Sequence, residues 1–215
     1  MANALSDIFD RLYRVFGPRH WWPGETAFEV MVGAVLTQNT AWINVEKAIN
    51  NLKEAGCLNP EALHRMSEKK LAGLIRPSGY YNLKAGRLKN MVSLVMDGGG
   101  GDPPLLLERP RERLRRELLD VKGIGPETAD SILLYAAGYP VFVIDAYTRR
   151  ILERHGLSHG HEPYGELQDM FMNNMPADPQ QFNEFHALLV HLGKHFCKPK
   201  PHCSGCPLED LKRSI

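Results

Sequence analysis

The residues best suited to chemistry lie in the second half of the chain, where a glycine-rich turn precedes Asp145. In the string Lys122 to Pro126, two glycines flank one apolar residue, which favours a tight hairpin whose backbone can approach a ligand closely. Pro126 suits the first position of a following helix, so the turn would leave amide groups at a helix N-terminus. Such amides favour an anion such as a DNA phosphate, although an ordinary corner between two helices would contain the same glycines.

Asp145 has two interpretations from its position alone. It follows a short apolar run, Val141 to Ile144, and precedes a helical pattern that begins at Ala146. Aspartate is a common helix N-cap after a non-helical stretch. A carboxylate can also act on a reacting group, and the glycine turn upstream favours that second role.

The elements that must position these residues are helices. Apolar residues recur at helical spacing, for example from Phe28 to Leu36 and from Val45 to Leu52. The run Val141 to Ile144 is the one short β-branched stretch, and we interpret it as a buried linker between helices. The segment Asp97 to Pro104 contains four consecutive glycines and is typical of a mobile surface connection. The pattern predicts an all-α protein.

Composition sets few further limits. The 215 residues contain 43% hydrophobic and 24% charged residues, which are ordinary values for a globular protein. A net charge of +1 means that any DNA-binding surface must be local. The start of the chain lacks the apolar core of a signal peptide, and no stretch approaches the roughly 20 apolar residues of a membrane span. These features predict a cytoplasmic protein with no membrane partner.

The hairpin, the helix after it and the string Asp145-Ala-Tyr-Thr-Arg-Arg together resemble the endonuclease III superfamily of helix-hairpin-helix DNA glycosylases. The resemblance covers nearly the whole chain. It implies a base excision repair enzyme that acts as a monomer on double-stranded DNA with a damaged base. Asp145 would be the essential carboxylate, which stabilises the oxocarbenium-like sugar and helps to orient the attacking water. The hairpin would grip the DNA backbone through Lys122, Gly123, Ile124 and Gly125.

This resemblance also implies an all-α, two-lobe fold with the active cleft between the lobes. We expect residues 26–135 to form a six-helix bundle that contains the helix-hairpin-helix at about 114–137. Residues 1–25 and 136–215 would form the second lobe, with a possible cysteine-rich loop at 197–212.

Glu127 bears on the type of glycosylase. Superfamily members that also cut the strand carry a lysine at the equivalent position, because an amine must attack the sugar C1′ to form a Schiff base. Glu127 cannot do this, and Lys122 lies on the other side of the turn. The sequence therefore predicts a monofunctional enzyme with water as the nucleophile, no AP lyase activity and no cofactor required for the chemistry. Alternatives are an endonuclease III-like glycosylase and AP lyase for oxidised pyrimidines, which would use Lys122 or another amine, and a non-catalytic DNA-binding module.

Three local strings are more specific. Trp21-Trp22-Pro23, Leu36-Thr-Gln38-Asn-Thr40 and Arg76-Pro-Ser-Gly-Tyr-Tyr-Asn82 look like those of the 3-methyladenine DNA glycosylase III subgroup, whose alkylated purine substrates leave readily as cations. The resemblance implies a base pocket formed by Trp21, Trp22, Pro23, Trp42, Glu127 and Lys194. Aromatic faces in such a pocket would hold a cationic base. It also implies that Gln38 enters the DNA stack to fill the place of the flipped nucleotide.

Each of these residues also has a structural interpretation. Trp21 and Trp22 could be core aromatics, although two adjacent tryptophans cannot both face one core from a helix. Gln38 could be a surface glutamine, and Glu127 could be a favourable acid in the first turn of a helix. Trp42 stands where the subgroup resemblance leads us to expect a phenylalanine.

The C-terminal cysteines Cys197, Cys203 and Cys206 resemble the superfamily's iron-sulfur loop, which uses four thiolates to hold a [4Fe-4S] cluster. Lys212 stands where the fourth cysteine belongs, and the first gap is five residues where the familiar pattern has six. Cys57 is far away in the sequence. His202 could help to bind another metal such as zinc, or the loop could hold no metal.

Overall fold

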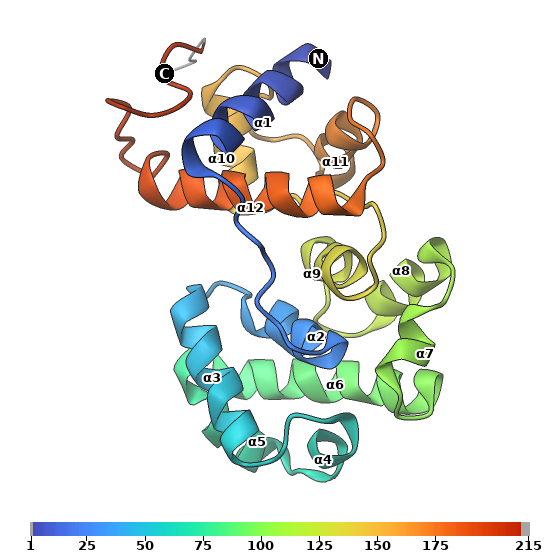
Figure 1. Ribbon diagram of the computed structural model, residues 1–215. Helices are drawn as coiled ribbons and strands as arrows, with labels where there is room; N and C mark the ends of the chain where they lie inside the picture. Colours follow the sequence, from blue (N-terminus) through green and yellow to red (C-terminus); the bar gives the residue numbers. More distant parts are fainter. Residues whose placement is uncertain (1, 212–215) are drawn as a thin grey trace. The chain divides into compact units, whose positions relative to one another are not determined.

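The structure of the chain is a computed structural model that describes residues 2–211, and within them it is built from helices with no β-strand. This confirms the predicted all-α class. The chain divides into two compact units (Figure 1). The terminal unit combines Met1–Trp21 with Pro140–Ile215, and the central unit is Trp22–Tyr139. Within residues 2–211 no helix is both long and apolar enough to cross a membrane.

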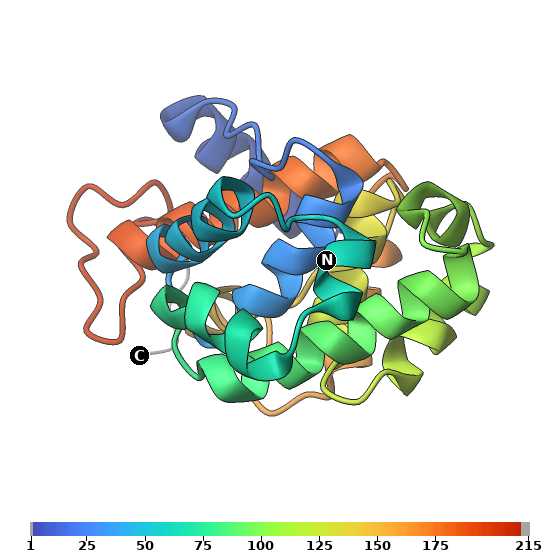
Figure 2. The same cartoon turned by 90° about the horizontal axis from the view of Figure 1, so that it is seen from below.

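The central unit is organised around its longest helix, α6 (Tyr81–Gly99). In Figure 1, α6 runs along the unit with α4 and α5 on one side of it and α2 on the other, and Figure 2 shows the helices from below. α2 is buried along almost its whole length because all its residues except Glu29 are apolar, which is typical of a core helix. The other elements of the unit are α2 (Ala27–Leu36), α3 (Trp42–Glu54), α4 (Pro60–Arg65), α5 (Glu68–Leu74), η1 (Arg76–Ser78), α7 (Pro103–Leu107), α8 (Arg111–Asp120), α9 (Pro126–Ser131) and η2 (Ile132–Ala136), a π-helical turn that continues α9.

The terminal unit contains α1 (Ala2–Phe16), α10 (Ala146–Arg154), α11 (Tyr164–Met172) and α12 (Pro179–His195). Both α1 and α10 pack against α12 (Figure 1). The approach of α10 is close because Gly193 has no side chain: a Cβ there would lie 2.3 Å from the Tyr147 ring. A cluster of phenylalanine rings fills the core, with Phe142 stacked on Phe171 at a centroid distance of 3.7 Å. This packing fixes the start of α10, where Asp145 lies.

Two expectations about irregular segments have different outcomes. Val141 to Ile144 is buried and has neither helical nor strand structure, so the predicted buried linker is confirmed. The glycine-rich connection was wrong in its extent, because α6 continues through Gly98 and Gly99. Arg109 donates a hydrogen bond to the Gly98 carbonyl, and Gly99 packs against Leu106, where a Cβ would lie 3.2 Å away. Tertiary contacts override the low helix propensity of glycine here.

Candidate active site and DNA-binding surface

The glycine turn forms the hairpin between α8 and α9, as its sequence predicts. Gly123 has a φ of +99°, which only glycine adopts readily, and Ile124 is buried beneath the turn. Gly125 caps α9 in an extended conformation, and Pro126 is the first helical residue. Gly125 and Lys122 are exposed, so the backbone of the turn and one cation are open to a ligand.

Arg87 of α6 supports this hairpin from inside the central unit. A Cβ on Gly123 would lie 2.4 Å from Cγ of Arg87, so the glycine is required by the close approach as well as by its φ. Arg87 also donates a hydrogen bond to Oε1 of Gln38, while Nε2 of Gln38 donates to the Gly123 carbonyl at 3.1 Å and to the Thr128 hydroxyl at 2.9 Å. Asn90, one turn further along α6, donates to the Lys122 carbonyl at 2.9 Å. α6 therefore ties the α2–α3 loop to the hairpin.

Gln38 lies in that loop, between the end of α2 and the start of α3. Its side chain is partly buried against the hairpin in this conformation. The predicted insertion of Gln38 into a DNA stack stays a prediction, and it requires the side chain to exchange these hydrogen bonds for contacts with DNA.

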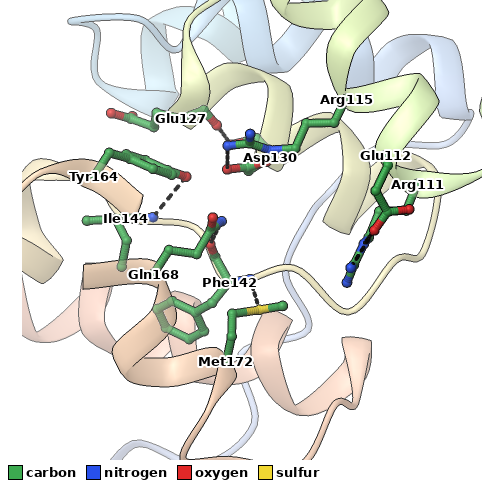
Figure 3. A network of polar contacts seen from close by, with 11 residues as sticks. Arg111, Glu112, Arg115, Glu127, Asp130, Phe142, Ile144, Tyr164, Gln168 and Met172 are labelled. Carbon is green, nitrogen blue, oxygen red and sulfur yellow. Dashed lines mark hydrogen bonds and ion pairs between the residues drawn. The ribbon is translucent and has the colours of Figure 1, made fainter. Parts of the chain in front are cut away.

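Asp145 is the N-cap of α10. Its Oδ1 accepts a hydrogen bond of 2.7 Å from the Thr148 amide, and its Oδ2 lies 3.7 Å from Nε2 of His186 on α12. The linker before it is held by α11: Gln168 donates to the Phe142 carbonyl at 2.7 Å, and the Ile144 amide donates to the Tyr164 hydroxyl at 3.4 Å (Figure 3). Capping is thus observed, and it fixes one carboxylate oxygen while the other points toward α12.

Two basic residues of α12, His186 and Lys194, interact electrostatically with Asp145. Burial lowers the pKa of His186 below its usual range, against the charge of Asp145, so the ring is neutral near pH 7. Desolvation by neighbouring protein atoms also lowers the pKa of Lys194, again opposed by Asp145, although the side chain reaches the surface. The Lys194 ammonium lies 6.0 Å from the centre of the Trp21 ring. The terminal unit thus brings together Asp145, Lys194 and Trp21.

The second group of predicted pocket residues belongs to the central unit. The Trp22 ring lies edge-on to Trp42 at a centroid distance of 5.0 Å and tilted against Tyr135 of η2 at 4.9 Å. Gly33 of α2 lies beneath Trp22, where a Cβ would be 3.1 Å from the indole ring. Pro23 is exposed beside them. Trp22, Trp42 and Tyr135 form one aromatic cluster of partly buried rings.

Glu127 is exposed on the first turn of α9. It lies beside the ion pair in which Arg115 donates two hydrogen bonds to the buried Asp130, at 2.7 and 3.0 Å (Figure 3). Glu127 is in the first turn of α9, where the helix dipole favours negative charge. Its predicted contact with a bound base stays a prediction.

The possible [4Fe-4S] cluster in the C-terminal loop stays a prediction. Within residues 2–211 no group of three or more histidine, cysteine or acidic side chains converges to hold a metal, and Lys212 lies outside the described residues. Cys197, Cys203 and Cys206 instead line a small hollow of about 160 Å³. Arg154 closes this loop: it donates to Sγ of Cys197 at 3.3 Å, to the Lys198 carbonyl at 2.5 Å and to the Pro199 carbonyl at 2.7 Å.

Sequence reasoning missed Tyr135, His186 and Arg87. His186 is eight residues before Lys194, a spacing that places both on similar sides of one helix, so the pattern contained a signal for it. Tyr135 and Arg87 make contacts with segments about 113 and 49 positions away, and local periodicity carries no signal for such pairs.

A glycine hairpin followed by a helix-capping aspartate, on an all-α scaffold, is the arrangement of a DNA repair glycosylase. The chain belongs to the HhH-GPD superfamily of base excision DNA repair proteins, whose family model matches residues 32–177. A protein assigned as a DNA repair glycosylase in Methanocaldococcus jannaschii is 43% identical over 210 residues, which are 97% of this chain and 96% of that protein.

The solved structures that are similar include a 3-methyladenine DNA glycosylase and an endonuclease III. The 3-methyladenine DNA glycosylase MagIII of H. pylori, bound to 1,N6-ethenoadenine, has a TM-score of 0.72 and 33% identity, with 90% of this chain and 95% of that chain covered. A non-covalent complex of endonuclease III with DNA has a TM-score of 0.84 at 23% identity, with 99% and 95% covered, and shows the shared fold. The resemblance to helix-hairpin-helix glycosylases is thereby confirmed.

Proposed function

We propose that this DNA glycosylase is monofunctional and hydrolyses the N-glycosidic bond of alkylated purines, such as 3-methyladenine, that are flipped out of double-stranded DNA. The observation that carries the proposal is the aromatic cluster of Trp22, Trp42 and Tyr135. Ring faces attract a cationic base by stacking and cation-π interaction, and an alkylated purine is such a base. The 33% identity with a structure of a 3-methyladenine glycosylase supports the same substrate class.

The absence of an amine at position 127 supports hydrolysis by water. A lyase needs a lysine on the second helix of the hairpin, and Glu127 has no nucleophilic amine. Lys122 precedes the turn and is exposed, with its carbonyl held by Asn90. The expected product is an intact abasic site with no strand cut.

Asp145 supplies the charge that this reaction requires. Its carboxylate is held in place by the Thr148 amide. The carboxylate can therefore stabilise the positive charge that develops on the sugar in the transition state without first having to move. A cationic purine leaves without strong general-acid help, so the enzyme needs recognition, sugar stabilisation and an oriented water. The hairpin amides and Lys122 would bind phosphates in a sequence-independent way. The proposal includes a cytoplasmic monomer, with no cofactor entering the chemistry.

The endonuclease III-like alternative has one observation in its favour, which is Lys194. Its lowered pKa leaves a larger share of neutral amine near pH 7 than an ordinary lysine has, and it is influenced by Asp145. An amine of this kind is suited to Schiff-base formation at an abasic sugar. Borohydride trapping of a covalent protein–DNA adduct that disappears in Lys194→Gln would establish this second activity.

The test of the main proposal is a product analysis on duplexes that contain 3-methyladenine, a deaminated base or an oxidised pyrimidine. We expect base release from the 3-methyladenine duplex and strand breaks only after alkali. Breaks before alkali would establish the lyase, and DNA binding without release of any base would leave a binding module.

A further inference from the structure

Lys84 is a fully buried lysine whose ammonium joins separate segments of the central unit. Its side chain lies on α6 with 1% of its surface exposed. Nζ donates hydrogen bonds to the Leu36 carbonyl at 2.8 Å, to the Thr40 hydroxyl at 2.7 Å and to the Ser78 carbonyl at 2.7 Å. All three donor positions of the ammonium are therefore used.

The acceptors belong to two loops that are far apart in the sequence. Leu36 and Thr40 bracket the loop that carries Gln38, and Ser78 ends the η1 turn that leads to Tyr80. The Thr40 hydroxyl also donates to the Ser78 carbonyl at 2.5 Å. One ammonium thus fixes the spacing between the Gln38 loop (residues 37–41) and the Tyr80 loop (residues 78–80).

Both loops contain a residue with a positive φ within two positions of an acceptor of the ammonium. Asn39, next to Thr40, has a φ of +53°, and Tyr80 has a φ of +44°. Left-handed conformations are uncommon for residues other than glycine, and they persist where surrounding contacts over-determine the backbone. The Tyr80 side chain is 71% exposed, so the network holds a large aromatic ring outward rather than burying it.

The charge of Lys84 is not neutralised by a carboxylate among the described residues; its hydrogen-bond partners are neutral oxygens. Burial and the neighbouring Arg87 lower the pKa of Lys84 to about 8. The groups that face the ammonium are the Leu36 carbonyl at the end of α2, the Thr40 hydroxyl and the Ser78 carbonyl of η1. Arg87 is the charged group whose repulsion lowers the pKa of Lys84. Arg87 in turn binds Gln38, so adjacent turns of α6 hold the Gln38 loop at two points.

We propose that Lys84 is a positioning residue for base extrusion: its ammonium holds the Gln38 loop and the Tyr80 loop as one rigid surface against which the DNA duplex opens. This inference rests on the proposed glycosylase function and deepens it. A neutral amine has two donors and a lone pair, so deprotonation leaves one of three oxygens without its donor and loosens the two loops.

The proposal predicts that protein stability and base extrusion respond to rising pH in opposite directions. The pKa of Lys84 in the folded chain is lower than the ordinary 10.5, so between about pH 8 and 10.5 the unfolded chain binds more protons at this group. The contribution of Lys84 to the free energy of unfolding therefore rises with pH in this window. Base extrusion should fall in the same window, because the extrusion surface requires the charged form. A merely structural lysine would not separate these two responses.

The experiment uses a duplex with a tetrahydrofuran abasic analogue next to 2-aminopurine, whose fluorescence rises when the base unstacks. The probe contains no alkylated base and is not cut, so a wrong substrate assignment would not affect the result. For the wild-type protein we expect the fluorescence enhancement to fall as the pH rises, with a midpoint near pH 8. The reason is that the protonated fraction of Lys84 falls roughly thirtyfold between pH 6.5 and 9.5. The thermal midpoint measured on the same samples should not fall in parallel.

Lys89 offers a matched control on the same helix. Its ammonium donates to the carbonyls of Leu63, His64 and Met66 at the end of α4, away from both loops. Lys84→Met should lose most of the fluorescence enhancement, about tenfold, and its pH dependence, whereas Lys89→Met should lose only stability. If Lys84→Met does not fold, Thr40→Val should weaken the enhancement and Thr40→Ser should restore it. A flat wild-type profile from pH 6.5 to 9.5, or equal enhancement in Lys84→Met and Lys89→Met, would overturn the proposal.

Discussion

Gly123→Ala tests the hairpin most directly, because two independent costs meet at one position. An L-residue at a φ of +99° is strained by roughly 1 to 2 kcal/mol. The new Cβ, 2.4 Å from Cγ of Arg87, must also displace that side chain, and losing the charge-assisted hydrogen bond to Gln38 costs about 1.5 to 3 kcal/mol more. The expected loss is about 2.5 to 5 kcal/mol, which corresponds to a fall of about 5 to 20 °C in the thermal midpoint.

Gly125→Ala is the matched control, two residues away. Gly125 has an extended φ of −98°, and nothing lies within 4 Å of a Cβ there. Its thermal midpoint should therefore stay close to that of the wild-type protein, while a methyl group on the exposed turn weakens DNA binding. Differential scanning calorimetry and fluorescence anisotropy with duplex DNA measure the two effects separately.

A double-mutant cycle separates the two costs at Gly123. In an Arg87→Ala background the clash is absent, so Gly123→Ala should cost only the roughly 1 to 2 kcal/mol of backbone strain. If Gly123→Ala costs the same in both backgrounds, the contact with Arg87 does not matter. If Gly125→Ala is as destabilising as Gly123→Ala, the reasoning from backbone conformation fails.

Two further predictions concern excision. Asp145→Asn should retain most DNA affinity but lose base release in single-turnover assays, since binding uses phosphates whereas the rate depends on transition-state charge; wild-type turnover by this variant on 3-methyladenine DNA would exclude the role. Trp22→Ala should lower excision by about ten- to a hundredfold, because base stacking on an aromatic ring is worth about 1 to 3 kcal/mol, and non-specific DNA affinity should change much less.

The sequence predicts the features whose causes are local. The hairpin needs glycine at a positive φ and a proline at the helix start, and both signals stand in adjacent positions of the chain. Asp145 at a helix N-terminus and the buried linker before it are also local patterns. These parts could be predicted because turn chemistry and capping depend on a few consecutive residues.

The parts that could not be predicted depend on long-range contacts. Lys84 is buried and donates to carbonyls that lie 6 and 48 positions away, and the sequence around it gives no local signal for such contacts. Gly98 and Gly99 read as a loop, but contacts from Arg109 and Leu106 keep them helical. The cleft between the lobes, and the meeting of Trp22 with Asp145 in one pocket, stay predictions.

The terminal unit is discontinuous in the sequence, and this affects how the protein is made. α1 emerges from the ribosome first, but its packing partner α12, which it meets through Phe9 and Phe185 at 5.4 Å, emerges last. The central unit is continuous from Trp22 to Tyr139 and can fold in between. At synthesis rates of about 5 to 20 residues per second, roughly ten to thirty seconds pass between the synthesis of α1 and that of α12. A chain released early therefore carries the hairpin but lacks α12, the helix that faces Asp145 through His186, so the surroundings of Asp145 are complete only after α12 has been made.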